Sequence, residues 1–310
     1  MKLTMKMALL LAIVVAVFVP AALLRAGEAP SSNPPQSNAA YLKSLNQWKA
    51  ELTESRKKNW ASLAGLFWLK PGENSFGKDS GNAVIFPKGP ARAGVFTLQN
   101  NDVTVRLLPD AHATINGKPV SESKLQSDSP GPATVVEMGS LQMHVIVRGQ
   151  RIGIRLKDTE SAAIRNFRAL EWFPVNMQYR VTAKWIPSDG KRMIDVPTVL
   201  GDVEPTPVAG TAVFQINGQE IRLTDVGGDP AKGLFFVFTD LTSKTETYPG
   251  GRFLDTDPVA KGTVVLDFNR AYNPPCSITP YATCPLAPRE NRLNLAIPAG
   301  QKYDRAHGHH

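Results

Sequence analysis

Proline and glycine divide this chain into short segments. Its 310 residues include 25 prolines and 24 glycines, and stretches of alternating apolar and polar residues run between them. Examples are Val103–Leu107 (VTVRL), Leu141–Val147 (LQMHVIV) and Arg151–Leu156 (RIGIRL). An alternation with a period of two is typical of a strand with one buried face. The sequence therefore predicts a mainly β fold made of antiparallel sandwich or barrel units.

Two Asn-Gly dipeptides mark tight turns between such stretches. They lie in Ile115–Lys118 (INGK) and Ile216–Gln219 (INGQ), and both residue types tolerate the positive φ that a two-residue hairpin turn needs. Each is predicted to close a β-hairpin. Further strands are predicted at residues 181–185, 211–216, 220–224, 234–238, 263–268 and 294–297. No alternation of strands with long helices is present, which argues against a nucleotide-binding parallel sheet.

One long helical pattern precedes the strands. It is expected to begin after Asn38, a suitable N-cap, and to end near Trp60. Its apolar residues at helical spacing are Tyr41, Leu45, Trp48 and Leu52.

A short helical turn is expected in the stretch DTESAAIRNF, residues 158–167. We place a boundary near residue 165, because a new series of strands begins after this turn. It divides the body, residues 39–302, into two β subdomains at about 39–165 and 166–302. Residues 303–310 are expected to form a disordered tail.

The first 26 residues have the pattern of an export signal. Lys2 and Lys6 precede an apolar run from Met7 to Leu24, interrupted at Pro20. The run is also near the lower length limit of a membrane span, so an uncleaved single-pass anchor is the alternative. The body is expected to be periplasmic or secreted, or to be anchored outside the cytoplasm. Residues 27–38 are rich in proline and serine and are expected to be a flexible linker.

The charge pattern gives no sign of a nucleic-acid partner. The chain has a formal charge of +8, to which the N-terminal segment contributes three positive charges, and the remaining basic residues are scattered. No basic cluster of the kind that contacts phosphate backbones is found. A membrane contact is expected only through the N-terminal segment, if that segment stays uncleaved.

No established catalytic or cofactor motif occurs. The sequence lacks a G-x-S-x-G elbow, an H-E-x-x-H zinc helix, a Walker loop and a G-x-G-x-x-G turn. His112 and His144 stand alone on predicted β segments, and the terminal HGHH is a frayed end. No cofactor and no metal site are therefore expected.

Residues 238–255 (FTDLTSKTETYPGGRFLD) form one candidate wall of a ligand pocket. Asp240 ends a predicted strand, and the glycines after Tyr248 return the chain to Arg252. A hairpin loop with a salt bridge explains these residues without any ligand. In the functional interpretation, all three side chains lie at a pocket rim where the arginine holds a carboxylate or phosphate.

Residues 267–293 (DFNRAYNPPCSITPYATCPLAPRENRL) form the second candidate wall. Two prolines after Asn273 force an extended path, and polar side chains on a rigid irregular segment are a common way to present a binding site. The polar residues assigned to ligand binding here are Asp267, Asn269, Arg270, Asn273 and Arg292.

The same stretch contains the only two cysteines of the chain, Cys276 and Cys284. A disulfide is the first interpretation for an exported protein. The alternatives are a metal site or redox thiols, although C-x₇-C is not a usual zinc spacing, and inert thiols.

The first half resembles a forkhead-associated sandwich. The resemblance is carried by LKPGENSFGKDSGNAVIFP and the later ATINGKPV. Lys78 stands where that family has an arginine, and ARAGVF replaces the expected serine and histidine. The resemblance therefore implies a fold without phosphopeptide binding.

A longer resemblance extends over nearly the whole body. RGQRIGIRLKD, FPVN, GRFL, residues 267–293 and the following AIPAGQK resemble the bacterial and archaeal domain-of-unknown-function 1684 family. The resemblance extends over about residues 45–302. It implies that these residues act as one unit, and it implies no particular activity.

These observations predict an exported protein that binds a small-molecule or anionic ligand in a polar pocket of the C-terminal β subdomain. Two alternatives remain open. One is a hydrolase in which Asp267 acts as general base. The other is a non-catalytic structural or protein-interaction module.

Overall fold

The computed structural model describes residues 38–305. The expected signal or anchor at residues 1–26, nearly all of the linker and the histidines of the terminal HGHH lie outside this range. Within the described range, no helix has the length and apolar character needed to cross a membrane. The chain from Lys43 onward forms one compact unit, and its parts are described in turn below.

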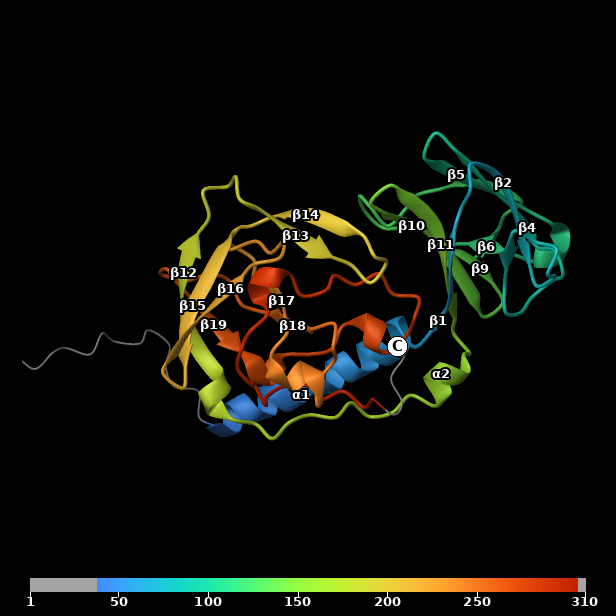
Figure 1. Ribbon diagram of the computed structural model, residues 1–310. Helices are drawn as coiled ribbons and strands as arrows, with labels where there is room; N and C mark the ends of the chain where they lie inside the picture. Colours follow the sequence, from blue (N-terminus) through green and yellow to red (C-terminus); the bar gives the residue numbers. More distant parts are fainter. Residues whose placement is uncertain (1–37, 306–310) are drawn as a thin grey trace, which may run out of the picture. The chain divides into compact units, whose positions relative to one another are not determined.

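The predicted N-terminal helix is confirmed as α1 (Asn38–Asn59). Its last turn carries Arg56, Lys57 and Lys58, whose charges interact favourably with the negative end of the helix dipole. From residue 43 onward the helix (Figure 1) contacts irregular segments of the second half, since the Trp48 ring lies 6.2 Å from that of Tyr272. Leu45 is fully buried, and the Trp48 ring lies 5.6 Å from that of Trp172.

The first β unit consists of two sheets. One sheet has the order β1-β11-β10-β9-β6-β7 and the other β3-β2-β4-β5-β8. Every pair is antiparallel except the short pair of β2 with β3. The strands are β1 (Leu63–Trp68), β2 (Gly72–Gly77), β3 (Val84–Ile85), β4 (Gly94–Gln99), β5 (Asp102–Leu107), β6 (Thr114–Ile115), β7 (Lys118–Pro119), β8 (Glu122–Leu125), β9 (Val136–Met138), β10 (Leu141–Arg148) and β11 (Arg151–Asp158).

The predicted hairpin at INGK is confirmed. Asn116 and Gly117 have φ values of 52° and 73°, as a two-residue turn requires, and they join β6 to β7. Buried side chains from both sheets form one apolar core, in which the rings of Phe76 and Phe96 stack at 4.2 Å. The resemblance to a forkhead-associated sandwich stays a prediction.

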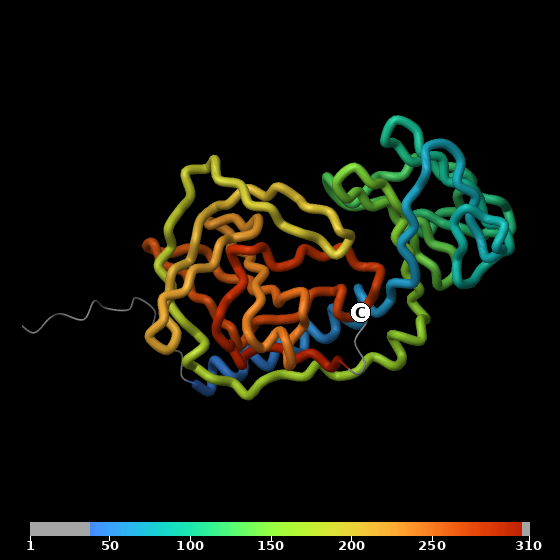
Figure 2. The backbone as a smooth tube through the Cα atoms, viewed as in Figure 1, coloured from blue at the N-terminus to red at the C-terminus, as the bar shows by residue number. Residues whose placement is uncertain are grey.

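A short helix and an extended segment follow the first β unit. Helix α2 (Ala162–Arg165) begins at Ser161, whose side chain accepts the N–H of Ile164. Residues 166–176 then run without regular helix or sheet to the second series of strands (Figure 2). The domain boundary near residue 165 stays a prediction.

The second β unit contains a four-stranded sheet, β16-β15-β12-β19, and two separate hairpins, β13-β14 and β17-β18. Its strands are β12 (Arg180–Pro187), β13 (Met193–Pro197), β14 (Val203–Pro207), β15 (Gly210–Ile216), β16 (Gln219–Thr224), β17 (Phe235–Phe238), β18 (Arg252–Asp255) and β19 (Thr263–Asp267). Asn217 and Gly218, with φ values of 53° and 77°, form the second predicted hairpin turn. The mainly β, antiparallel prediction is confirmed.

Short 3-10 helices punctuate the connections. They span Pro109–Ala111, Met177–Tyr179, Leu241–Lys244, Phe268–Arg270, Pro275–Ser277 and Arg289–Asn291. Three of them lie within residues 267–293, so this proline-rich stretch is an ordered irregular segment rather than a loose loop.

Three local expectations differ from the structure. Residues 294–297 form no strand, because their backbone bonds go singly to other loops, as in Leu241 N–H to Leu295 O. The hairpin of β13 with β14 was not predicted, since β14 (VEPTP) holds two prolines that sequence rules place outside central strands. The tail was expected from residue 303, yet Tyr303 is buried and donates its N–H to Glu246 O.

Candidate functional site

A cavity of about 370 Å³ opens beside the proline-rich segment of the second β unit. Three stretches contribute nearly all of its wall: the chain after α2, the segment around the 3-10 helix Pro275–Ser277, and the last described residues. The lining residues are Ala61, Ala163, Asn166, Phe167, Arg168, Ala169, Leu170, Glu171, Asn273, Ser277, Ile278, Gln301, Lys302, Tyr303 and Asp304.

Asn273 is held firmly in this wall. Its backbone N–H donates to Gln301 Oε1 at 2.9 Å, and its Nδ2 donates to Lys302 O at 2.8 Å. The residue is only 2% exposed, and among the described residues its Oδ1 has no hydrogen-bond donor. A buried acceptor without a partner costs about 1–3 kcal/mol. A donor group in the cavity would remove this cost.

Gln301 supplies the complementary group. Its Oε1 accepts from Asn273, which leaves the Nε2 amide as a donor, and no hydrogen bond joins that amide to a described residue. The residue itself is fixed by its backbone N–H, which donates to Ala271 O at 2.8 Å. Two residues of the wall thus carry an acceptor, Asn273 Oδ1, and a donor, Gln301 Nε2, that no described residue pairs.

The charged residues of the wall balance one another. Arg168 and Lys302 are cationic, and Glu171 and Asp304 are anionic. The Lys302 ammonium lies over the Phe173 ring at 4.9 Å, so it already has a favourable partner. The remaining lining side chains are mainly small or apolar. The lining therefore shows no surplus of positive charge.

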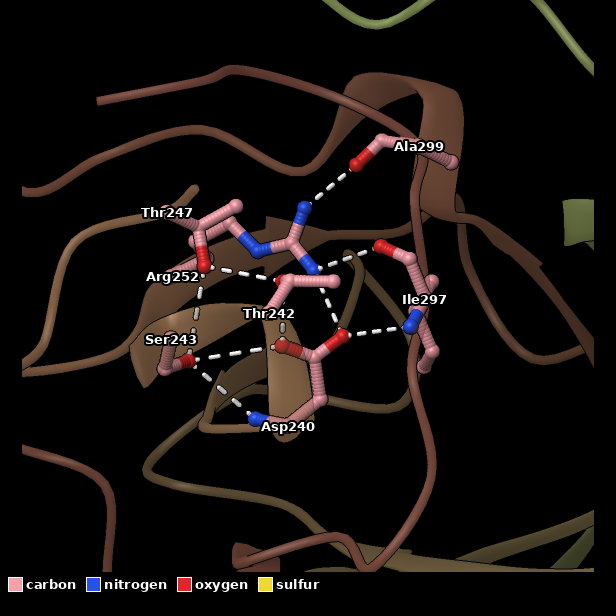
Figure 3. A network of polar contacts seen from close by, with 7 residues as sticks. All are labelled: Asp240, Thr242, Ser243, Thr247, Arg252, Ile297 and Ala299. Carbon is pink, nitrogen blue, oxygen red and sulfur yellow. Dashed lines mark hydrogen bonds and ion pairs between the residues drawn. The ribbon is translucent and has the colours of Figure 1, made fainter. Parts of the chain in front are cut away.

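Of the eight residues predicted to bind a ligand, only Asn273 lines this cavity. Asp240 and Arg252 form a fully buried ion pair instead, with 3.1 Å between Arg252 Nη2 and Asp240 Oδ2 (Figure 3). The guanidinium also donates to Ile297 O and Ala299 O. Burial lowers the pKa of Arg252, and the adjacent Asp240 opposes that shift.

The Asp240 carboxylate is saturated by the same network. Its Oδ2 accepts the backbone N–H of Ile297 at 2.6 Å, and its Oδ1 accepts the hydroxyl of Thr242 at 2.6 Å. Thr242 is in turn hydrogen-bonded to Thr247 at 3.0 Å (Figure 3). Both charged groups are therefore paired inside the protein. Arg252, which was predicted to lie at the rim of a pocket, is a core residue that links β18 to residues 297–299.

Asp267 and its neighbours also hold the chain rather than face the cavity. Asp267 Oδ1 accepts from the backbone N–H and Nδ2 of Asn269, both at 3.2 Å. Asn269 exchanges two further bonds with the backbone of Asn176, each of 3.0 Å. Arg270 lies with its Nε 3.8 Å from Asp267 Oδ2 and its guanidinium over Trp48. Asp267, the general base of the hydrolase alternative, therefore does not line this cavity.

Arg292 is exposed, whereas the asparagine beside it is fully buried. Asn291 Oδ1 accepts the Thr224 N–H at 2.8 Å, and its Nδ2 donates to Thr224 O and Val237 O. This side chain therefore links β16 to β17 by hydrogen bonds. In the stretch PRENRL, residues 288–293, Asn291 therefore holds the fold together, whereas Arg292, the residue predicted to bind a ligand, is exposed.

The two buried cysteines and the partly buried Tyr248 belong to a separate cluster. Cys276 and Cys284 are free thiols in the structure, so the predicted disulfide is not formed. They are nonetheless neighbours, since the Cys276 N–H donates to Cys284 Sγ at 3.2 Å. No group of three or more potential metal ligands occurs among the described residues.

The residues that sequence reasoning missed are those following α2 and those in GQKYD, residues 300–304. Gln301 and Lys302 belong to the AIPAGQK stretch that already carried a family resemblance, and this was the available signal. Their relation to Asn273 depends on a contact across 28 residues, which no local pattern predicts.

Comparisons with known proteins give a family match over part of the chain but no activity. The solution NMR structure of an uncharacterized protein of Haloarcula marismortui is 29% identical to this chain and covers 46% of it and 80% of its own length, with a TM-score of 0.39. A search of curated proteins found no match.

The family match lies in the part of the chain that carries most of the cavity. It covers residues 165–302, a shorter range than the 45–302 expected from the sequence motifs. Asn273, Ser277, Gln301 and Lys302 all fall inside it. Residues 165–302 match the model of the family described as protein of unknown function DUF1684.

Proposed function

We propose that this protein binds a small, uncharged molecule carrying an amide group in the cavity next to Asn273. The observation that carries the proposal is the buried Asn273 Oδ1, which has no donor among the described residues. An amide N–H of the ligand donates to this oxygen. The ligand carbonyl accepts from Gln301 Nε2, so both polar groups of the wall are paired at once.

The surroundings support the same ligand class. Phe167, Leu170 and Ile278 offer apolar surface for the remainder of the molecule, and the wall has no surplus charge that would select an anion. A volume of about 370 Å³ lies within the usual range for a small-molecule pocket. Binding without chemistry is favoured over hydrolysis because Asp267 is absent from the lining.

A thermal-stability screen of the full chain tests this proposal. The panel compares benzamide with methyl benzoate, which lacks the N–H donor, and with benzoate, which is anionic. A ligand that binds only the native state raises the unfolding temperature. We expect benzamide to raise it in a saturable way and the other two to have little effect. Equal effects of all three, or none, would refute the proposal.

Two tryptophan variants of α2 localise the effect. Ala163 is exposed and lines the cavity, whereas Ala162 is exposed next to it and does not. Ala163→Trp should fill the cavity and abolish stabilisation by benzamide, and Ala162→Trp should preserve it. Loss of the effect in both variants, or in neither, would place the ligand elsewhere.

We also propose that the protein acts outside the cytoplasm. The support is the pattern of residues 1–26, in which two lysines precede an apolar run.

A further inference from the structure

The cysteine cluster lies outside the cavity and is not used by the proposed function. Cys276 belongs to the 3-10 helix Pro275–Ser277, and Cys284 follows eight residues later. Their exposed fractions are 7% and 4%. The Cys276 N–H donates to Cys284 Sγ at 3.2 Å, and both side chains pack in one apolar cluster with the partly buried Tyr248. Two prolines directly before Cys276 stiffen this arrangement.

The two thiols differ in their tendency to ionise. The hydrogen bond from Cys284 lowers the pKa of Cys276 against the opposing effect of burial, and the Tyr248 hydroxyl and the charge of Arg56 act in the same direction. The same thiol pair and burial raise the pKa of Cys284. Cys276 is therefore expected to be the more readily ionised thiol of the pair.

Cationic and phenolic groups from several elements face this pair. Arg56 of α1 is 7% exposed, its Nε has no hydrogen-bond partner among the described residues, and its guanidinium lies over the Tyr272 ring at 5.1 Å. Arg155 of β11 interacts with Cys284 through its charge. Tyr303 packs edge-on against Tyr248 at 5.0 Å. A thiolate at Cys276 would give these buried guanidinium groups a nearby negative charge.

We propose that Cys276 and Cys284 form a redox-active dithiol that reduces small disulfides, with Cys276 as the nucleophile and Cys284 as the resolving thiol. Such pairs combine a nucleophilic thiolate with a second thiol close enough to resolve the mixed disulfide. The structure contains the reduced form. The substrate must be small, because little of either cysteine is exposed.

The exchange proceeds in two balanced steps. The Cys276 thiolate attacks one sulfur of the substrate disulfide, a mixed disulfide forms, and the other half leaves as a thiolate. Cys284 then loses its proton and its Sγ attacks Sγ of Cys276, which releases the second half. Two electrons pass from the protein to the substrate, and the two thiol protons of the protein end on the two released thiols.

The first test is a redox titration of the full chain. The protein is equilibrated with mixtures of reduced and oxidised dithiothreitol, quenched with acid and weighed intact. We expect one two-electron transition with the loss of two hydrogens, and the transition should be absent in Cys276→Ser and in Cys284→Ser. A native protein that keeps both thiols in the most oxidising mixture would overturn the proposal.

The second test needs no cysteine variant. Native protein is labelled with iodoacetamide at a series of pH values, and peptide mass spectrometry measures the labelling rate of each cysteine. Cys276 should react faster and at lower pH than Cys284. Tyr248→Phe should shift the Cys276 profile to higher pH, because it removes a donor to the thiolate. The control Tyr281→Phe changes a tyrosine of the same segment and should leave the profile unchanged.

Two outcomes of the labelling experiment would contradict the proposal. One is an equal labelling rate at both cysteines throughout the pH series. The other is an identical pH profile in the wild type and in Tyr248→Phe while circular dichroism shows that the variant is folded.

Discussion

The ion pair of Asp240 with Arg252 places two charges in the interior of the second β unit. Both side chains are fully buried, and four further hydrogen bonds join them to residues 242 and 297–299. A buried charge that loses its partner is strongly destabilising, even where the intact pair adds little net stability. The role assigned to these residues is therefore structural, and it can be tested by removing one charge.

Asp240→Asn should lower the free energy of unfolding by about 3 kcal/mol or more, because it leaves the Arg252 guanidinium buried without a counter-charge. Urea unfolding of the variant and the wild type measures the difference. The control is Asp102→Asn, which breaks the exposed pair with Lys124 and should cost no more than about 1 kcal/mol. Similar small losses in both variants would show that the buried pair lacks the role given to it.

Most of the residues predicted to bind a ligand do not line the cavity, because their sequence context does not show what they face. Aspartate and arginine at the ends of strands look alike in sequence whether they face a pocket or each other. What decides between these roles for Arg252 is the chain at residues 297–299, 45 or more residues away. Asn273 was predicted to bind a ligand, but the free acceptor that makes it interesting exists only because Gln301 and Lys302 occupy its other polar atoms.

At the scale of elements, the hairpins were the most predictable feature. The Asn-Gly turns at residues 116–117 and 217–218 determine their own backbone geometry, so local sequence was enough. The segment at residues 294–297 was not predictable in this way. Its bonds go to the Leu241 N–H and to the side chains of Asp240 and Arg252, and only the tertiary fold brings these groups beside it.

Gly218→Ala tests the hairpin between β15 and β16. A Cβ at Gly218 would meet no atom within 4 Å, so any cost comes from the φ of +77° alone. We expect a loss of about 1 kcal/mol in the free energy of unfolding. Gly81→Ala is the control, because that glycine is exposed and has an ordinary φ, and it should change stability by less than about 0.5 kcal/mol. A cost at Gly81 as large as that at Gly218 would contradict the backbone explanation.

The end of β11 predicts a pH dependence. Burial alone would raise the pKa of Asp158, but hydrogen bonds from Lys88, the Glu160 N–H and Ser140 hold it below its usual range. The stabilisation is therefore present above the pKa that Asp158 has in the unfolded chain and is lost as pH falls through its folded value.

Asp158→Asn should accordingly be less stable than the wild type at pH 7, with the difference shrinking as the pH is lowered below about 4. Thermal or urea unfolding at several pH values measures this difference. A difference in stability between the variant and the wild type that stays constant from pH 7 to pH 3 would contradict the role given to the Asp158 carboxylate.

At the scale of the whole molecule, composition and pattern were sufficient for the fold class. Short alternating segments between prolines and glycines gave a mainly β chain with one N-terminal helix, as observed. The cavity could not be predicted, because its wall is assembled from the chain after α2, the proline-rich segment and the last described residues. Three such distant stretches share no periodicity that a sequence pattern could reveal.

Export is the prediction that concerns the molecule in its cell. When the full chain is expressed in a Gram-negative bacterium, we expect it outside the cytoplasm, either shortened near residue 26 or held at the membrane. Cell fractionation and the mass of the purified protein measure both outcomes. A variant lacking residues 2–26 should remain in the cytoplasm. An intact wild-type chain in the cytoplasmic fraction would contradict the export proposal.

The central claim is that an amide-bearing molecule pairs with Asn273 and Gln301. Its most direct test is a titration of isotope-labelled protein with benzamide, followed by the backbone N–H signal of Asn273 and the side-chain amide signals of Gln301 in NMR spectra. The claim predicts saturable shifts of these signals with a single dissociation constant. Saturable shifts confined to other parts of the protein, or no shifts at all, would contradict it.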